Sequence, residues 1–241
     1  YEIHERLVGS EMCIRDRFLF MPQEPIRPVL ILEQIIEKLK EDIVLGKISQ
    51  GEALRETDLQ QRFNISRSPI RDALRILEKQ GFVQIIQRKG AFVRTLTPRD
   101  MRNIYDVRAV LEGLAAKEAK RLDAQIVEKL KVALNRMTQA FEQHSYSDYL
   151  KAHDSFHRVW IDGCANPFLI EEALRLHDLS TWYAIYSQFE DMDFRHTIEA
   201  HQAILNIFSN PDSRPEDIEN CVRNNILSGG ERVRKKMVQK T

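Results

Sequence analysis

Glycine and proline are scarce in this sequence, which contains 9 Gly and 8 Pro in 241 residues. A chain with so few turn residues argues against a strand-rich sandwich or barrel and favours long helices. No apolar run approaches the 18 residues of a membrane span, and no basic segment leads into an apolar run with a cleavage site. We therefore expect a cytoplasmic protein with no membrane partner.

Cysteine is also scarce. The three cysteines, Cys13, Cys164 and Cys221, are odd in number and far apart. This spacing fits neither a disulfide framework nor a zinc site built from Cys-x-x-Cys pairs. We expect free thiols in a reducing compartment.

An excess of charge of either sign is absent, because 36 Lys and Arg balance 36 Asp and Glu. Taken alone, the neutral sum argues against a nucleic-acid partner, but a sum can hide a local field. Residues 62–94 contain eight basic and two acidic residues, a net charge of +6, so the remainder of the chain carries −6. Hydrophobic residues make up 43% of the chain, which is enough for a sizeable core.

Residues 1–22 do not read as part of a folded domain. They begin with Tyr and show no helical or strand period up to Met21-Pro22. The first twenty residues also resemble a translated sequencing adapter. We interpret residues 1–22 as an extension and leave open whether they are native.

Three helices and a hairpin are predicted between residues 29 and 94. The first helix runs from residue 29 to near Gly46-Lys47, and the second is capped by Thr57-Asp58 and ends at Asn64. The third helix spans about 68–80, with Ser66 or Ser68 as its cap. Alternating apolar residues in 82–86 and 91–94 then predict a β-hairpin.

The third helix has two different faces. Ile70, Ala73, Leu74 and Leu77 form its apolar stripe. Arg67 and Arg71 are four residues apart on the opposite side, where each guanidinium can contact a guanine or a phosphate. Such a basic stripe alone is more often a solvated helix face. Two short helices joined by a tight turn, with a basic second helix, are instead typical of a helix-turn-helix.

The segment Ser66 to Leu74, followed by Leu77, Gly81, Val83, Gly90 and Val93, closely resembles the winged helix-turn-helix of GntR-type bacterial transcription regulators. The resemblance covers about residues 29–95. It implies DNA contacts from Thr57, Arg67, Ser68, Arg71, Lys89 and Gly90. From their place at the hairpin tip, Arg88 and Lys89 are expected to reach the adjacent minor groove or the DNA backbone. We assign residues 23–96 to this domain.

Residues 97–241 return to helical periods, with about six or seven helices and no internal repeat. Val107-Arg108, Leu111-Glu112, Phe156-His157, Asn166-Pro167 and His201 resemble the markers of the FCD domain of the same family. The resemblance implies an antiparallel helical bundle that binds a small carboxylate effector, and in many members a divalent metal. The expected fold is thus mainly α, a winged helix-turn-helix joined to an all-α effector-binding and dimerisation domain.

A metal site is predicted around three histidines. His153 and His157 are spaced i, i+4 on one helix, so their imidazoles can face the same point, and His201 could complete a trio. Without the family resemblance, such a pair is more often two ordinary polar residues. The family pattern has Asp where this chain has His153, and His where our alignment places Asn225. Imidazoles suit zinc, nickel, iron or copper, and we expect zinc or nickel.

Arg108 has two interpretations. It can bind an effector carboxylate bidentately in the same pocket, or it can pair with Glu112 one turn along its helix. Trp182 is expected to serve mainly as core. His177 has no partner that the sequence reveals.

These patterns predict a homodimeric transcription regulator, most simply a repressor, that binds a near-palindromic operator in double-stranded DNA and responds to a small organic acid. The alternative is a metal-dependent hydrolase or lyase that uses His153, His157 and His201, with the winged helix as an accessory. No carboxylate stands as an obvious general base for that chemistry, and no nucleophile motif is present.

Overall fold

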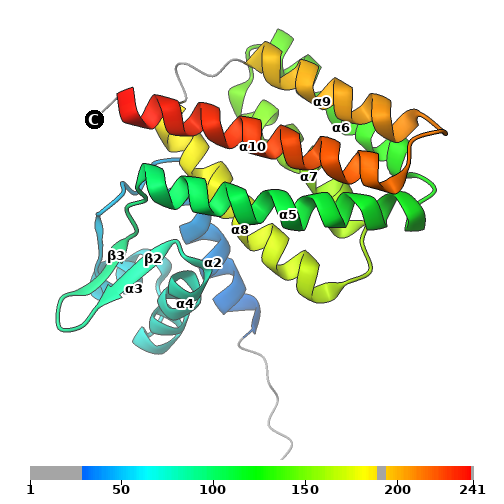
Figure 1. Cartoon of the computed structure of the whole chain (residues 1–241). Coiled ribbons are helices and arrows are strands. Elements are labelled where there is room, and N and C mark those ends of the chain that lie inside the picture. The colour runs from blue at the N-terminus through cyan, green and yellow to red at the C-terminus, as the bar shows by residue number, and fades with distance from the viewer. Residues whose placement is uncertain (1–28, 189–193, 240–241) are drawn as a thin grey trace, which may run out of the picture.

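The computed structural model describes residues 29–188 and 194–239. The expected extension, residues 1–22, lies outside the described residues, as does Cys13. The described part consists of an N-terminal lobe, residues 29–96, and a helical bundle, residues 98–239 (Figure 1). The predicted fold, a winged helix-turn-helix joined to an all-α bundle, is confirmed.

The N-terminal lobe contains three helices and a three-stranded antiparallel sheet. Its elements are α2 Val29–Val44, β1 Ala53–Leu54, α3 Glu56–Phe63, α4 Arg67–Gln80, β2 Val83–Ile86 and β3 Gly90–Val93. The strand order is β1-β3-β2. The sequence predicted only the hairpin of β2 and β3 and missed β1, because a two-residue strand has no period to detect. Pairing of Ala53 with Phe92 joins it to the wing.

Helix α4 forms as its sequence predicts. Its apolar stripe, Ile70, Ala73, Leu74 and Leu77, is buried. Gly81 ends the helix at φ +93°, a left-handed conformation that glycine adopts without a Cβ clash. Ser66 holds the N-cap position, although its side chain makes no capping hydrogen bond.

The start of α3 differs from the prediction. The helix begins at Glu56 with Arg55 at the cap position, so Thr57 and Asp58 lie inside the first turn instead of capping it. Their side chains bond to each other, Thr57 Oγ1 donating to Asp58 Oδ1 at 3.0 Å. The strand pairing of the preceding Ala53–Leu54 fixes where the chain can turn into the helix. Asn64 ends α3 in the left-handed conformation, as predicted.

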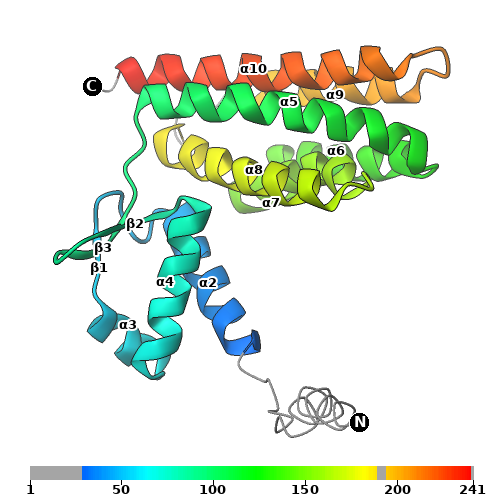
Figure 2. The ribbon, with the colours of Figure 1, turned by 60° about the horizontal axis from the view of Figure 1, so that its bottom comes forward.

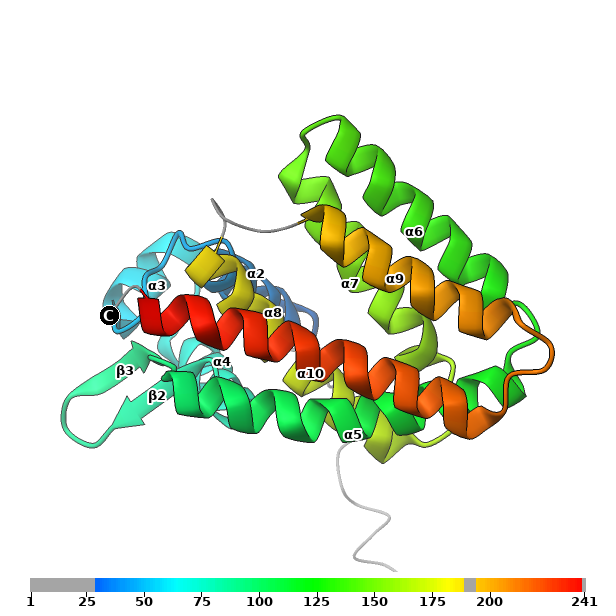
Figure 3. The same ribbon diagram turned by 45° about the horizontal axis from the view of Figure 1, so that its top comes forward.

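Six helices form the bundle: α5 Pro98–Leu122, α6 Ile126–Glu142, α7 Tyr146–Asp162, α8 Pro167–Gln188, α9 Phe194–Ser209 and α10 Pro215–Gln239. A capping box between Thr97 and Asp100 starts α5. Helices α5 and α10 lie side by side and antiparallel, and α6 packs on α7 and α9 (Figure 3). None of the described helices is long and apolar enough to cross a membrane.

Helix α8 connects the two parts of the molecule. It packs on α5 in the bundle and on α2 in the N-terminal lobe. Figure 2 shows the lobe lying against the side of the bundle that α8 forms. The ring of Trp182 on α8 packs at a tilt against Phe82, which directly follows α4 and Gly81, with ring centroids 5.3 Å apart. Trp182 is fully buried, as expected of a core residue.

Candidate functional site

The first candidate surface is the exposed face of α4. Arg67 and Arg71 leave 60% and 52% of their side chains exposed, on the side opposite the buried stripe. Both guanidinium groups bond to Glu56 of α3: Arg71 Nε lies 3.0 Å from each carboxylate oxygen, and Arg67 Nε donates to Oε2. These contacts lower the pKa of Glu56, because Arg67 and Arg71 favour its charged form. The sequence analysis did not single out Glu56.

The wing extends the same basic surface. Ile86 pairs with Gly90, so residues 87–89 form the tip of the hairpin. Arg88 takes a left-handed conformation at φ 65°, and Gly90 has φ +105°. Arg88, Lys89 and Gly90 are all exposed, as are Thr57 and Ser68. All predicted DNA-contacting residues are therefore accessible to a partner.

The second candidate site is a histidine cluster in the bundle. His153 and His157 project from α7 and His201 from α9, and their ligand nitrogens lie within 4.8 Å of one another. His157 and His201 are buried, and His153 is half-buried. The predicted trio is thus brought together by two helices far apart in the sequence.

The hydrogen bonds of the cluster fix which imidazole nitrogens carry protons. His157 Nδ1 lies 2.9 Å from Glu112 Oε2, and His201 Nδ1 lies 2.7 Å from the backbone oxygen of Thr197. Each oxygen can only accept a hydrogen bond. Arg108 NH2, which can only donate, also lies 3.2 Å from His157 Nδ1, but the Glu112 carboxylate is closer, so we assign the proton of each ring to Nδ1. The two Nε2 atoms then carry lone pairs, and they face each other at 3.2 Å. Two lone pairs at that distance repel unless a proton or a cation lies between them.

The surroundings keep the cluster neutral. Burial lowers the pKa of His157 to about 4, although Glu112 favours the protonated form. Burial and the neighbouring His157 lower the pKa of His201 to about 3. The pKa of His153 lies well below its usual value for the same reasons, burial first. A neutral imidazole with a free lone pair is the form that binds metal ions.

A small pocket opens at this cluster. It has a volume of about 100 Å³ and brings Asn225 of α10 to the three histidines, as the sequence alignment predicted. The residues that line it are Tyr105, Arg108, His153, His157, Thr197, His201, Asn225, Ile226, Gly229, Arg232 and Val233. The lining contains no acidic side chain, whereas it contains two arginines. The charged side chains of the lining are therefore all basic.

Comparison with known proteins identifies the two parts of the chain. A family model described as bacterial regulatory proteins, gntR family, matches residues 31–93, and the FCD domain model matches residues 103–224. The HTH-type transcriptional regulator YdhC of Bacillus subtilis is 30% identical over 74% of this chain and 81% of its own length. The chain belongs to the GntR family.

A second relative is also named a transcriptional regulator, and a solved structure shares the fold. The HTH-type transcriptional repressor RspR of Escherichia coli is 30% identical over 56% of this chain and 59% of its own length. The structure of Escherichia coli McbR/YncC has the same fold, with a TM-score of 0.71 at 20% identity over 85% of this chain and 97% of that one. This GntR-family chain is a DNA-binding transcriptional regulator, so the alternative of a metal-dependent hydrolase or lyase is wrong.

Arg108 is held in place by four side chains. Its Nε donates to Glu112, NH1 lies 2.9 Å from Ser180 Oγ, and NH2 lies 2.8 Å from His177 Nδ1 and 3.2 Å from His157 Nδ1. The guanidinium is buried but also lines the pocket. The expected pair with Glu112 is present. Arg108 also lines the pocket, so the interpretation as an effector ligand stays a prediction.

Sequence reasoning paired Glu112 with Arg108 but missed the rest of this network, His177 included. Glu112 is fully buried and also accepts from Trp160 Nε1 at 3.1 Å. Burial would raise the pKa of Glu112, but Arg108 and His157 hold it well below its usual value. His177 is fully buried, with Nε2 3.0 Å from Asp154 Oδ1. The i, i+4 spacing to Arg108 indicated Glu112, whereas nothing in the sequence places His177 beside it.

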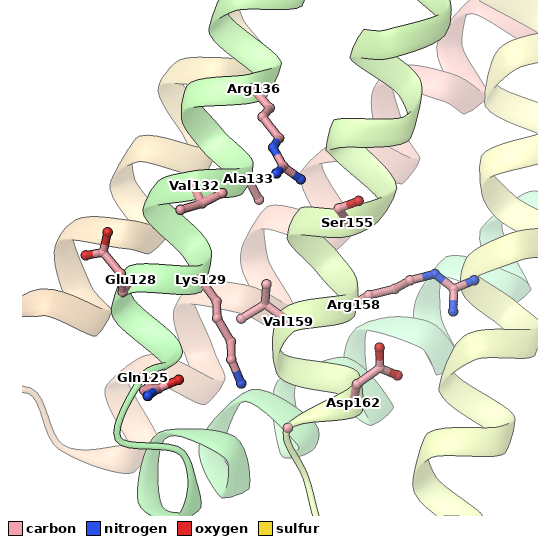
Figure 4. Close-up of a pocket in the computed structure, with 11 residues that line it drawn as sticks. Gln125, Glu128, Lys129, Val132, Ala133, Arg136, Ser155, Arg158, Val159 and Asp162 are labelled. Carbon is pink, nitrogen blue, oxygen red and sulfur yellow. The ribbon is translucent and has the colours of Figure 1, made fainter.

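A larger groove than the histidine pocket lies elsewhere in the bundle. A groove of about 780 Å³ between α6 and α7 is lined by Val132, Ala133 and Val159, with Lys129 and Arg136 projecting into it (Figure 4). Lys129 pairs with Asp123 at 2.7 Å, and the side chain of Lys129 is about half exposed. The groove therefore lacks the buried, converging polar groups that distinguish the smaller histidine pocket.

Proposed function

We propose that this GntR-family protein is a repressor whose operator affinity is controlled by a small carboxylate bound, together with a divalent metal, in the histidine pocket. Operator DNA is contacted by α4 and the wing. The relative RspR is named a repressor, which supports this mode of action. Such a regulator acts where the DNA is, so we place it in the cytoplasm.

One observation carries the metal proposal: the lone pairs of His157 Nε2 and His201 Nε2 face each other at 3.2 Å. Two zinc–nitrogen bonds of about 2.0–2.1 Å at a tetrahedral angle place their nitrogens about 3.3–3.4 Å apart. The observed spacing therefore fits two ligands of one ion. Glu112 and Thr197 hold the opposite nitrogens, as outer partners of metal-bound histidines generally do.

His153 and Asn225 complete the proposed set. His153 supplies a third imidazole, with ring centroids 4.8 Å from His157 and 5.0 Å from His201. Asn225 lines the pocket and offers a weaker oxygen ligand or a hydrogen bond to bound water. Three neutral imidazoles suit zinc or nickel. A bound ion would supply a Lewis-acidic position for carboxylate oxygens.

The effector is proposed to be a small organic acid. The pocket volume of about 100 Å³ limits the ligand to a few heavy atoms beside the ion. Among the pocket arginines, Arg108 is neutralised by Glu112. The positive charge of Arg232, which donates to Ser228 Oγ at 2.9 Å, has no such acidic partner within the lining. We therefore infer that Arg232 attracts the carboxylate and that Arg108 sets the edge of the site.

The protein is further proposed to act as a homodimer. One α4 reads one half-site, and a near-palindromic operator calls for two copies related by a two-fold axis. A ligand that binds one arrangement of the two copies more tightly would shift the population toward it and change operator affinity.

The test is a selection of bound sequences from random DNA, repeated with zinc and with a panel of small carboxylic acids. Recovery of a palindrome supports the dimeric operator-binding regulator, and a shift of affinity with one acid identifies the effector class. Metal analysis of the purified protein runs beside it. A protein that binds neither zinc nor nickel contradicts the metal part, and a protein that selects no sequence contradicts operator recognition.

A further inference from the structure

Helix α8 presents adjacent residues to the two halves of the molecule. His177 contacts the buried network around the histidine cluster: Nδ1 lies 2.8 Å from Arg108 NH2 and 3.5 Å from Glu112 Oε1. The next residue, Asp178, pairs through Oδ2 with Lys40 of α2, in the N-terminal lobe. Two consecutive residues of α8 therefore contact the pocket network and the DNA-binding lobe.

Alternating charges join these contacts into a continuous chain. Asp154 accepts from both sides: Oδ1 lies 3.0 Å from His177 Nε2, and Oδ2 lies 2.8 Å from Arg158 Nε. Arg158 NH2 lies 3.1 Å from Asp178 Oδ1, and the other oxygen of Asp178 holds Lys40. The carboxyl of Asp178 thus connects α7 in the bundle to α2 in the lobe.

In the N-terminal lobe, this series of charged contacts ends beside the C-terminal end of α4, the helix proposed to contact DNA. Lys40 Nζ lies 5.2 Å above the centre of the Phe82 ring, which packs against Trp182 of α8. A Cβ on Gly81, the residue that ends α4, would come within 3.4 Å of Leu179. The exposed fractions of Lys40 and Asp178 are 25% and 15%, so their pair is largely shielded from solvent. Partly buried pairs are screened less by salt than surface pairs.

We propose that Asp178 is a positioning residue that couples ligand occupancy of the histidine cluster to the placement of α4. The inference rests on the proposed metal site. A ligand that restrains the side chains of Glu112 and His157 also restrains His177, which contacts Glu112, and therefore α8. The residue after His177 is Asp178, which pairs with Lys40. Coupling is reciprocal, so breaking the Lys40–Asp178 pair must also change the affinity of the cluster for its ion.

The test measures zinc affinity of the full chain by competition with a chromophoric chelator, for wild type, Lys40→Met, Asp178→Asn and the double variant. We expect each single variant to bind zinc about three- to tenfold more weakly. The double variant should be no weaker than either, because both changes remove the same pair. Lys38→Met, on the same helix, is the matched control and should leave zinc affinity unchanged.

The direction of the change in zinc affinity in each variant distinguishes coupling from a simple effect of charge. If the two residues act only through their charge, removal of Lys40 tightens zinc binding and removal of Asp178 weakens it, and the effects add. That pattern, or unchanged affinity in all variants, overturns the proposal and leaves the metal site intact. A wild-type chain that binds no zinc or nickel overturns both.

Hydrogen exchange of the wild-type chain gives a second measurement that needs no variant. Zinc should slow amide exchange around Asp178–Trp182 and at Gly81–Val83. It should leave the exchange of α3, which has no contact in the chain of charges, unchanged. Slowing confined to α7 and α9 would contradict the coupling.

Discussion

His157 and His201 face each other with their Nε2 atoms 3.2 Å apart, although they are 44 residues apart in the sequence. Each ring is turned to this position by a bond at its other nitrogen, to Glu112 and to the backbone oxygen of Thr197. The arrangement favours a cation between the rings. It is the basis of the first prediction.

Zinc is expected to stabilise the wild-type chain and not His201→Ala. At a free concentration about 100 times Kd, binding adds about 2.7 kcal/mol to the free energy of unfolding. For a chain of this size that corresponds to a rise in Tm of about 5–10 °C. His196→Ala, an exposed histidine on the same helix, is the control and should keep the full shift. An equal shift in His201→Ala would exclude His201 from the site.

Arg71→Ala is expected to weaken specific operator binding without unfolding the lobe. A bidentate contact to a base contributes about 1–3 kcal/mol, so operator affinity should fall about 10- to 100-fold. The side chain is 52% exposed, and its loss leaves no buried cavity. Arg214→Ala, an exposed arginine of the bundle, should bind as wild type does. Titration of a labelled operator checks both, and wild-type affinity in Arg71→Ala would remove Arg71 from the interface.

Glu56→Gln should reduce discrimination between operator and random DNA. The carboxylate holds both Arg67 and Arg71 in the free protein, so its loss releases two positive charges and their fixed orientation. We expect tighter binding to random DNA by a few-fold and a steeper salt dependence. The specificity ratio, measured at two salt concentrations, should fall. Asp72→Asn, also on the exposed face of the lobe, serves as the control for the change of charge.

Protonation of Asp42 should lower the stability of the lobe as the pH falls. Burial is the largest single influence and opposes ionisation, but Arg62, Lys47 and Lys38 together outweigh it and lower the pKa of Asp42 below its ordinary value. A lowered pKa means that the carboxylate stabilises the fold above the unfolded pKa, near 4, and loses that effect as pH falls through the folded value.

The measurement for Asp42 is urea unfolding of wild type and Asp42→Asn between pH 6 and pH 3. Wild type should be more stable by about 1–2 kcal/mol at pH 6, and the difference should shrink below pH 4. The exposed variant Glu41→Gln should show a smaller difference. A difference between wild type and Asp42→Asn that stays constant with pH would contradict this role.

Substitution by alanine should change the stability of the protein in opposite directions at Gly229 and Gly230, two adjacent glycines of α10. A Cβ on Gly230 would lie 2.5 Å from Cγ of Tyr105, in the close contact between α5 and α10, so Gly230→Ala should cost about 1–3 kcal/mol. At Gly229 the nearest heavy atom is the NH2 of Arg232, at 3.9 Å. Gly229→Ala should therefore stabilise the helix by up to about 1 kcal/mol. Thermal unfolding of the two variants tests the pair.

Local patterns predicted most of the N-terminal lobe. The buried stripe of Ile70 and Leu74, the end of the third helix at residue 80 and the hairpin that follows are properties of neighbouring residues, and each appears where the sequence predicts it. The start of α3 was displaced, because the pairing of the short strand β1 with β3 sets it. That pairing joins residues about forty positions apart and leaves no local period.

The sequence by itself determined the family, the basic surface and the two histidines on one helix, because these depend on residue identity and on spacing within a single turn. The sequence also shows that a chain with no net charge carries a local charge of +6 over residues 62–94. Only the tertiary structure decided that His201 faces His157, that Glu112 and His177 share one buried network, and that Asp178 reaches Lys40. Those relationships depend on the packing of helices that are distant in the chain, and helical periodicity carries no information about which helix will lie alongside.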